Sequence, residues 1–476
     1  MSQTAEAAPR HITGFGSRAY RSYVLNALLL VYVLNFMDRA LLSVVAPRMK
    51  PELGISDTAF GLLTGFGFAL LYTLVGVPLA QVAERRHRVW IMSVCVALWS
   101  LMTALCGLAS EVTIGAVTIG AFWVLLACRV GVGIGEAGCT PPANSLIADY
   151  FPPTARSTAL GYYAMGVALG GLLANLIGGP ITDAYGWRTA FFALGAPGIV
   201  IAILFKLTVR EPPRGYSDPP GVVRAPRPRF SEALKVLARK PAFWTMTAGA
   251  TAAAFCGYGI ASFQSLFLSR SFGLSAGEAA LTINAPVALA QAAGALATGW
   301  FAEKLAARHP NAIAWLPGAG LILSVPFYWL AFTTGNLGLC LFALCVGGAV
   351  KFGYNTAQYA IGQAIVPPPM RAVTTAILLL VVNLLGYGFG PLFIGGVSDL
   401  LFHVQVADLG AGHLTRSACE GAARAALAAS DQGVCAIAHP QSLECSLLVT
   451  ATLYTLSGAF FLLTCRYLAR DTVMRG

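Results

Sequence analysis

GIGEAG, at Gly133–Gly138, matches the G-x-G-x-x-G spacing of dinucleotide-binding loops and follows an apolar run. Such a loop needs a short strand, a tight turn and an opening helix in an α/β unit, with an acidic residue about 20 residues further on. The chain shows no alternation of strand and helix patterns. Glycines at Gly131, Gly135 and Gly138 instead recur at spacings that let membrane helices approach closely. We therefore predict helix packing here, and no nucleotide binding.

The composition indicates a polytopic membrane protein. Of 476 residues, 57% are hydrophobic and 11% are charged, whereas a soluble domain carries about 25% charged residues. The sequence contains no H-E-x-x-H, no G-x-S-x-G and no clustered metal ligands. We therefore expect neither an enzyme nor a metal or cofactor site.

Runs of about 20 mostly apolar residues predict the membrane spans. Twelve such runs are present, so the expected fold is an all-α integral membrane protein. The predicted spans lie near 20–46, 57–82, 88–109, 115–148, 156–182, 187–208, 242–269, 276–302, 312–333, 336–365, 371–399 and 443–466.

The distribution of lysine and arginine predicts the orientation. With both termini cytoplasmic, 22 of the 31 basic residues fall in inside segments and 6 in outside loops. This excess on the inside matches the positive-inside rule. It also accounts for most of the net charge of +11, so we expect no nucleic-acid partner. The expected location is a bacterial inner membrane.

A polar, Pro-rich linker divides the chain into two halves. We predict an N-terminal six-helix bundle at 1–208, a cytoplasmic linker at 209–241 and a C-terminal six-helix bundle at 242–476. The two bundles are expected to be pseudo-symmetric and to enclose a central cavity.

Part of the linker has the pattern of a short helix. In RFSEALKVLARK, Phe230, Leu234 and Leu237 follow helical spacing behind Ser231 as a candidate cap. The pattern favours an amphipathic helix on the inner membrane face, and a solvated linker helix is the alternative.

Internal repeats support two related halves. An offset of 215 residues superposes Glu136 on Lys351, an acid on a base. Parallel repeats are typical of two-bundle transporters, so we expect these two side chains to approach one cavity from opposite bundles. The repeated segments are YFPPTARSTALG (150–161) with IVPPPMRAVTTA (365–376), GGPITD (178–183) with IGGVSD (394–399), and VPLAQVAERR (77–86) with GWFAEKLAAR (299–308).

Five charged residues lie well inside predicted spans, away from the span ends: Asp38, Arg39, Arg129, Glu136 and Lys351. Facing lipid, they would together cost roughly 12–17 kcal/mol, so we expect them to face the interior, paired or hydrated, around a shared aqueous gap. Arg129 and Glu136 share a helix face about 10 Å apart, so each should find its partner on another helix or in a water-filled cavity. A structural charge network near the membrane surface is the alternative, especially for Arg39.

Several stretches resemble the major facilitator superfamily, over nearly the whole chain. They include FMDRALLSVVAPRMKPELGISD, CRVGVGIGEAG and SLIADYFPPTARSTALG. The Asp-Arg of the first span and the Arg-x6-Glu of the fourth resemble the spinster branch. That resemblance implies a lipid transporter for lysophospholipids or sphingosine phosphate, with proton coupling. It assigns coupling and binding to Asp38, Arg129 and Glu136.

One loop departs from the superfamily pattern. Where the superfamily has G-x-L-A-D-R-x-G-R-R, this chain has VPLAQVAERR, with Gln81 for the acid and Val82 for the first arginine. A cytoplasmic latch through that acid is therefore in doubt, and Glu303 of GWFAEK is its only remaining counterpart. The candidate gating residues are Arg85, Arg86, Glu303, Arg156 and Arg371.

The intramembrane charges predict the substrate class. They sum to +1 with both acids ionised and to +3 with both protonated, which favours an anionic head group, and apolar and aromatic faces lie beside them. We expect Asp38 and Glu136 to couple protons. The candidate substrate-binding residues are Arg129, Arg39, Lys351, Tyr162, Tyr258 and Tyr354.

The predicted function is a secondary active transporter that moves an anionic amphiphile by alternating access. We expect a monomer. The alternatives are a carrier for small organic anions or sugar phosphates, a drug/proton antiporter, and a receptor.

The last predicted outside loop, 400–443, carries cysteines. A bridge between Cys419 and Cys435 and two free thiols are both compatible with the sequence. Within that loop, SACEGAARAALAAS predicts a short helix outside the membrane.

Overall fold

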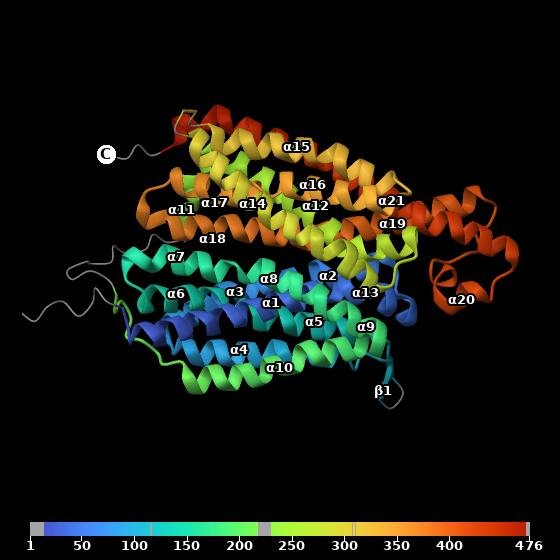
Figure 1. Cartoon of the computed structure of the whole chain (residues 1–476), viewed down its shortest axis with the longest axis horizontal. Helices are drawn as coiled ribbons and strands as arrows, with labels where there is room; N and C mark the ends of the chain where they lie inside the picture. Colours follow the sequence, from blue (N-terminus) through green and yellow to red (C-terminus); the bar gives the residue numbers. More distant parts are fainter. Residues whose placement is uncertain (1–13, 115–116, 218–229, 307, 310, 473–476) are drawn as a thin grey trace, which may run out of the picture.

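The computed structural model describes residues 14–114, 117–217, 230–306, 308–309 and 311–472. Within this part, twelve helical segments are long and apolar enough to cross a membrane, which confirms the predicted number. Helices of the first half lie together along one side of the molecule and helices of the second half along the other (Figure 1). The division at 208 and 241 stays a prediction.

The N-terminal bundle contains six spans, three of which are built from consecutive shorter helices. Its helices are α1 (Arg18–Leu53), α2 (Asp57–Thr64), α3 (Phe66–Arg85), α4 (Arg88–Cys106), α5 (Ala121–Ala137), α6 (Thr140–Tyr150), α7 (Pro153–Ala164), α8 (Gly166–Leu173), the π-helical η2 (Ala174–Gly178), α9 (Gly179–Tyr185) and α10 (Trp187–Thr208).

The C-terminal bundle repeats this plan after a short linker helix. Its elements are α11 (Phe230–Ala238), α12 (Pro241–Phe272), α13 (Ala276–Ala279), the π-helical η3 (Ala280–Asn284), α14 (Ala285–Ala306), α15 (Ala312–Thr333), α16 (Leu337–Lys351), α17 (Tyr354–Ala364), η4 (Pro368–Met370), α18 (Arg371–Val381), the π-helical η5 (Val382–Tyr387), α19 (Gly388–Asp408), η6 (Ser417–Cys419), α20 (Gly421–Ala425) and α21 (Ala429–Asp471).

The glycines of the fourth span pack against the third, as predicted. A Cβ on Gly131 would lie 2.6 Å from Cγ of Met102, and one on Gly135 would lie 2.8 Å from Cβ of Trp99. Side chains at these positions would separate α5 from α4. The G-x-G-x-x-G spacing therefore serves helix packing.

The start of the predicted fourth span is wrong. Val112–Ile114 (β1) and Val117–Ile119 (β2) pair antiparallel, and the helix begins only at Ala121. The repeated Val-Thr-Ile sequence consists of β-branched residues that favour strands. We name the end of the molecule that carries this hairpin and α20 the hairpin end, and the opposite end the terminal end (Figure 1).

The last outside loop is shorter than predicted. Helix α19 continues to Asp408 and α21 begins at Ala429, so 409–428 is the actual connection. The predicted outside helix is present as α20. Cys419 and Cys435 form a disulfide, and Cys435 and Ala438 bury an apolar side of the extended α21 against Phe402 of α19.

The linker helix α11 forms, and its predicted place on the inner membrane face stays a prediction. Ala233 and Leu237 are buried, whereas Phe230 and Leu234 are exposed. Because the helix begins at Phe230, Ser231 lies inside its first turn and is not the cap. Indole Nε1 of Trp244 donates to the carbonyl of Leu237 and fastens α11 to α12.

Candidate functional site

Asp38 and Arg129 form one buried pair inside the N-terminal bundle. Oδ1 of Asp38 on α1 lies 3.6 Å from a terminal guanidinium nitrogen of Arg129 on α5, and Oδ2 accepts a hydrogen bond from Thr103 on α4. Within the described part of the chain, no nitrogen of the Arg129 guanidinium makes a hydrogen bond. The pair is therefore held by charge and leaves several buried donors unused.

Arg39 and Glu136 form a second and closer pair. Nε of Arg39 on α1 donates to Oε2 of Glu136 on α5 over 2.6 Å. The Arg39 guanidinium also lies 4.7–5.0 Å from the ring centres of Phe36, Phe68 and Tyr72. Aromatic faces attract such a cation. Arg129 and Glu136 each have a partner on α1, as predicted.

The prediction that these groups face an aqueous gap is wrong for three of them. Asp38 is 4% exposed, Arg129 0% and Glu136 1%. Each acid has a base on a neighbouring helix of the same bundle, so ion pairs take the place of hydration. The Arg39 side chain is the most open of the four, at 12% exposed, and it interacts with Tyr258 of the opposite bundle.

Lys351 is bound within its own bundle, and its approach to a cavity shared with Glu136 stays a prediction. Its Nζ donates to the Tyr454 hydroxyl over 3.0 Å and lies 5.2 Å from the ring centre of Tyr328. Both tyrosines belong to the C-terminal bundle. Lys351 and Glu136 thus occupy equivalent helices, but each is bound by its own bundle.

The three candidate tyrosines lie in different surroundings. Tyr258 is half-buried, with its ring centre 5.0 Å from that of Tyr387. Tyr354 is buried in the core of the C-terminal bundle. Tyr162 is more exposed and donates from its hydroxyl to Oδ1 of Asn26. Of these three, Tyr258 is the one recorded beside Arg39, and the binding role of each stays a prediction.

The proposed gating residues are not brought into one cluster by any described contact. Arg85 and Arg86 are exposed at the end of α3. Arg156 donates to the carbonyl of Ala148 over 2.6 Å, and Arg371 is half-buried at the start of α18. The side chain of Glu303 lies outside the described residues. Their gating role stays a prediction.

A buried cluster of charged residues at the terminal end was not predicted from the sequence. Arg88, counted among the basic loop residues, is 0% exposed. Its Nε donates to Glu211 over 2.6 Å, its Nη1 binds Asp149 and Ser145, and its Nη2 donates to the carbonyl of Pro212. The cluster fastens the chain that leaves α10 onto α4 and α6. The acid of REPPR, directly after the sixth span, was the available signal.

A second missed cluster, which we name the hairpin-end network, joins the two bundles. Asp57 at the start of α2 is 0% exposed. Arg270 at the end of α12 binds both its carboxylate oxygens over 2.7 and 2.8 Å. Lys50 lies 3.0 Å and Arg416 lies 2.8 Å from the same carboxylate. One acid of the N-terminal bundle thus holds two arginines of the other bundle.

Glu420 extends this network from the loop before α21. Its Oε1 lies 2.6 Å from Nζ of Lys50, 2.8 Å from Arg270 and 2.9 Å from Nε2 of His439. Burial alone would raise the pKa of Glu420, but the hydrogen bond to His439 and the charges of Lys50 and Arg270 lower the pKa from 4.5 to about 2. With Asp399, which lies 2.7 Å from Arg416, the network brings three acids together with one lysine, two arginines and one histidine.

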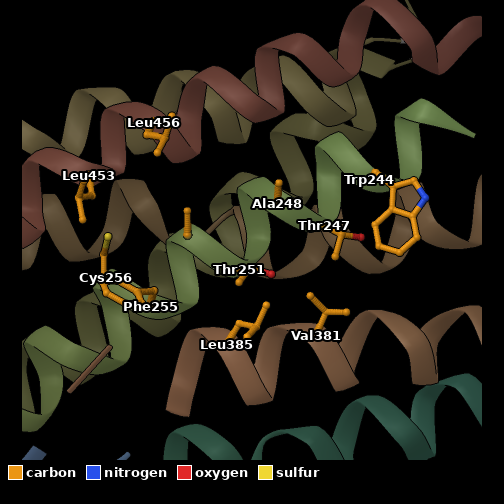
Figure 2. A pocket seen from close by; sticks show the side chains of 11 residues that line it. Trp244, Thr247, Ala248, Thr251, Phe255, Cys256, Val381, Leu385, Leu453 and Leu456 are labelled. Carbon is orange, nitrogen blue, oxygen red and sulfur yellow. The ribbon is translucent and has the colours of Figure 1, made fainter. Parts of the chain in front are cut away.

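An apolar groove of about 450 Å³ lies in the C-terminal bundle. Figure 2 shows Trp244, Thr247 and Phe255 on one helix, with Leu385 and Leu453 on the neighbouring helices that face them. Its lining residues are Trp244, Thr247, Ala248, Thr251, Ala252, Phe255, Cys256, Val381, Leu385, Leu453 and Leu456. Trp244, Leu385 and Leu456 are exposed, so the groove opens on the outer surface of the bundle.

Residues 28–391 match the family model of the Major Facilitator Superfamily. The chain belongs to this superfamily. A bacterial homologue of the human lysosomal transporter spinster, crystallised in an inward-facing and unoccupied conformation, is similar in structure, with a TM-score of 0.89. It is 40% identical, and the match covers 97% of this chain and 100% of that one.

Two curated relatives agree with this placement. An MFS-type efflux pump of Mycolicibacterium smegmatis is 34% identical over 82% of this chain and 86% of its own length. Protein spinster homolog 1 of Homo sapiens is 29% identical over 82% of this chain and 75% of its own length. The protein is therefore a spinster-like integral membrane transporter of the superfamily. Its relatives are transporters and not enzymes, as expected.

Proposed function

We propose that this protein is a proton-coupled carrier for an anionic amphiphile, such as a lysophospholipid or a sphingosine-phosphate-like lipid. The observation that carries the proposal is the position of Arg39. Its guanidinium is bound to Glu136, is surrounded by the rings of Phe68 and Tyr72, and is the least buried of the four central charges.

The proposed coupling step is the protonation of Glu136. While the carboxylate is ionised, it neutralises Arg39 over 2.6 Å. A proton on Glu136 removes that charge, and the positive charge of Arg39 then attracts the phosphate of a substrate. Asp38 can act on Arg129 in the same way. Proton and substrate shift the balance between states only through their different affinities for each state.

The charge balance supports an anionic head group. The two central pairs are neutral as pairs, so Lys351 leaves the five intramembrane charges at +1. Half-buried Tyr258 and Tyr387 from the C-terminal bundle lie near Arg39. An anion at Arg39 would therefore contact both bundles, which a carrier cycle requires.

The groove shown in Figure 2 favours a substrate that carries an acyl chain. It follows α12 from Trp244 to Cys256, twelve residues that span about 18 Å at the rise of an α-helix. Its lining is almost entirely apolar. A chain of roughly that length could lie along it while the substrate enters or leaves through the membrane.

We further propose that the terminal end faces the cytoplasm of a bacterium, since most of the basic residues are expected on that side. A monomer remains the expected state.

Export of an apolar drug is the second candidate, favoured by the likeness to the mycobacterial efflux pump. The deciding experiment reconstitutes the protein in liposomes with a pH gradient and compares flux of a lysophospholipid, a small organic anion and a cationic dye. We expect gradient-driven flux of the lysophospholipid. Flux of the dye alone would favour drug export over the proposal. Flux of the small anion alone would exclude a lipid as the substrate.

A further inference from the structure

Two aspartates related by the internal repeat cross the interface between the bundles. Asp183 ends GGPITD and Asp399 ends IGGVSD. Oδ2 of Asp183 accepts hydrogen bonds from Oγ of Ser275 over 2.6 Å and from the backbone N–H of Gly277 over 2.8 Å. Asp183 therefore binds the start of a helix in the other bundle.

Asp399 makes the reciprocal contact. Its Oδ2 accepts from the backbone N–H and the hydroxyl of Thr58, both over 2.7 Å, and its Oδ1 accepts from the N–H of Asp57 over 3.2 Å. Asp183 thus contacts the first turn of the helix that starts at Ala276, and Asp399 contacts the first turn of α2. The contacts obey the pseudo-symmetry of the two halves.

These contacts satisfy groups that a helix leaves unpaired. The first N–H groups of a helix have no partner within it, and a carboxylate there is also favoured by the helix dipole. Both helices already have a cap of their own, because Ser56 accepts from Ala59 and Ser275 accepts from Glu278. The aspartate from the opposite bundle is an additional acceptor. Its hydrogen bonds can form only while the two bundles are in contact at this point.

Glycines let the two bundles come this close. A Cβ on Gly395 would lie 2.1 Å from the carbonyl oxygen of Asp57, and one on Gly179 would lie 2.6 Å from Cβ of Ala280. Backbone therefore packs on backbone at both contacts. Any separation of the bundles at the hairpin end would break both aspartate contacts.

The two contacts differ in their surroundings. Asp399 lies 2.7 Å from Arg416 and is continuous with the hairpin-end network. The nearest base recorded for Asp183 is Arg48, which belongs to its own bundle and lies 3.9 Å away. The Asp183 side chain is 27% exposed, against 15% for Asp399.

We propose that Asp183 and Asp399 are paired latches that hold the hairpin end closed during the transport cycle, and that the Asp183 latch opens first. They act as positioning residues on the bundles and do not contact the substrate. The opening order follows from the unequal surroundings: in the described part of the chain, the helix start that Asp399 contacts is also held by ion pairs of Asp57 with Arg270 and Arg416 across the interface. The inference requires alternating access but neither a lipid substrate nor proton coupling.

The test is hydrogen–deuterium exchange of the full-length protein in lipid nanodiscs, without substrate. We expect Asp183→Ala to speed exchange of 276–284 about fivefold, and to leave 57–64 nearly unchanged. Asp399→Ala should speed exchange of 57–64 by a smaller factor, because the ion pairs around Asp57 remain. Asp183→Asn, which keeps an oxygen acceptor, should lie between the wild type and Asp183→Ala.

Asp431→Ala is the matched control, because Asp431 pairs with His413 at the same end without crossing the interface. It should change neither segment. Thermal unfolding of each variant identifies any general loss of folding, in which case the Asp183→Asn variant decides. Wild-type exchange in both Asp183 variants would overturn the latch. A larger effect of Asp399→Ala than of Asp183→Ala would overturn the opening order.

Discussion

The central charges and the hairpin-end network are both buried, yet they connect different parts of the molecule. Asp38, Arg39, Arg129 and Glu136 all belong to the N-terminal bundle. The hairpin-end network takes its acids and bases from both bundles. Charge can therefore change at the centre without movement of the bundles, whereas separation of the bundles must break the network. We assign the binding of substrate and protons to the central charges, and the control of conformation to the hairpin-end network.

Glu136→Gln should have the largest effect. The variant keeps the shape of the side chain but cannot release or bind the proton that switches Arg39, so flux driven by a pH gradient should fall at least about tenfold. Liposome flux of a lysophospholipid, with and without the gradient, measures this.

Glu52→Gln is the control for that experiment, since Glu52 binds Arg188 and Trp187 within one bundle at the surface. It should transport normally. A gradient response that survives in the Glu136→Gln variant would remove Glu136 from the coupling mechanism.

Asp57→Ala should have the next largest effect, on stability. Arg270, Arg416 and Lys50 would lose their shared acceptor, and removal of one partner from a buried ion pair costs about 3–5 kcal/mol. Thermal unfolding in detergent should show a clear decrease in Tm. Asp431→Ala, again the control, should leave Tm unchanged, and an unchanged Tm for Asp57→Ala would mean that the network is not a major source of stability.

Arg39→Lys should have a moderate effect on binding. Lysine keeps the positive charge but loses the planar group that lies over Phe68 and Tyr72, so affinity for an anionic amphiphile should fall about tenfold. Titration with a lysophospholipid measures the Kd. Arg188→Lys alters a similar arginine over Trp187 at the surface and should leave Kd unchanged. Equal Kd values for wild type and Arg39→Lys would argue against binding at Arg39.

A pH change between 5 and 8 should have the smallest effect, at the hairpin end. The pKa of Glu420 is lowered from 4.5 to about 2, so its contribution to stability is complete above about 4.5 and is lost as the pH falls toward 2. Glu420 stays ionised over this range, so it should add no pH dependence to the exchange of 57–64 once the intrinsic pH dependence is corrected for. A transition between pH 5 and 8 would show that the hairpin end itself senses protons.

The central residues could be predicted because charges are rare inside apolar spans. Asp38, Arg129 and Glu136 stand out in the sequence, and their helical spacing required partners on other helices. Which arginine binds which acid could not be predicted, because Asp38 and Arg39 are adjacent and point to different neighbours. Their burial also depends on how α1 packs against α5.

The hairpin-end network gave no comparable signal. Lys50, Asp57 and Arg270 lie at span ends, where charged residues are common and normally solvated. Glu420 lies in a loop whose course depends on the extension of α21 to Ala429. Only the approach of the two bundles converts these ordinary surface charges into one buried cluster.

The sequence by itself determined the twelve spans, the two related halves and the presence of charges within the membrane, because apolar length and the cost of a charge in lipid act locally along the chain. The tertiary structure alone decided which charges pair, that Lys351 binds Tyr454 of its own bundle, and that Asp183 and Asp399 contact helix starts of the opposite bundle. Those outcomes depend on distances between segments about 100 or more residues apart, which helix packing fixes and local pattern does not encode.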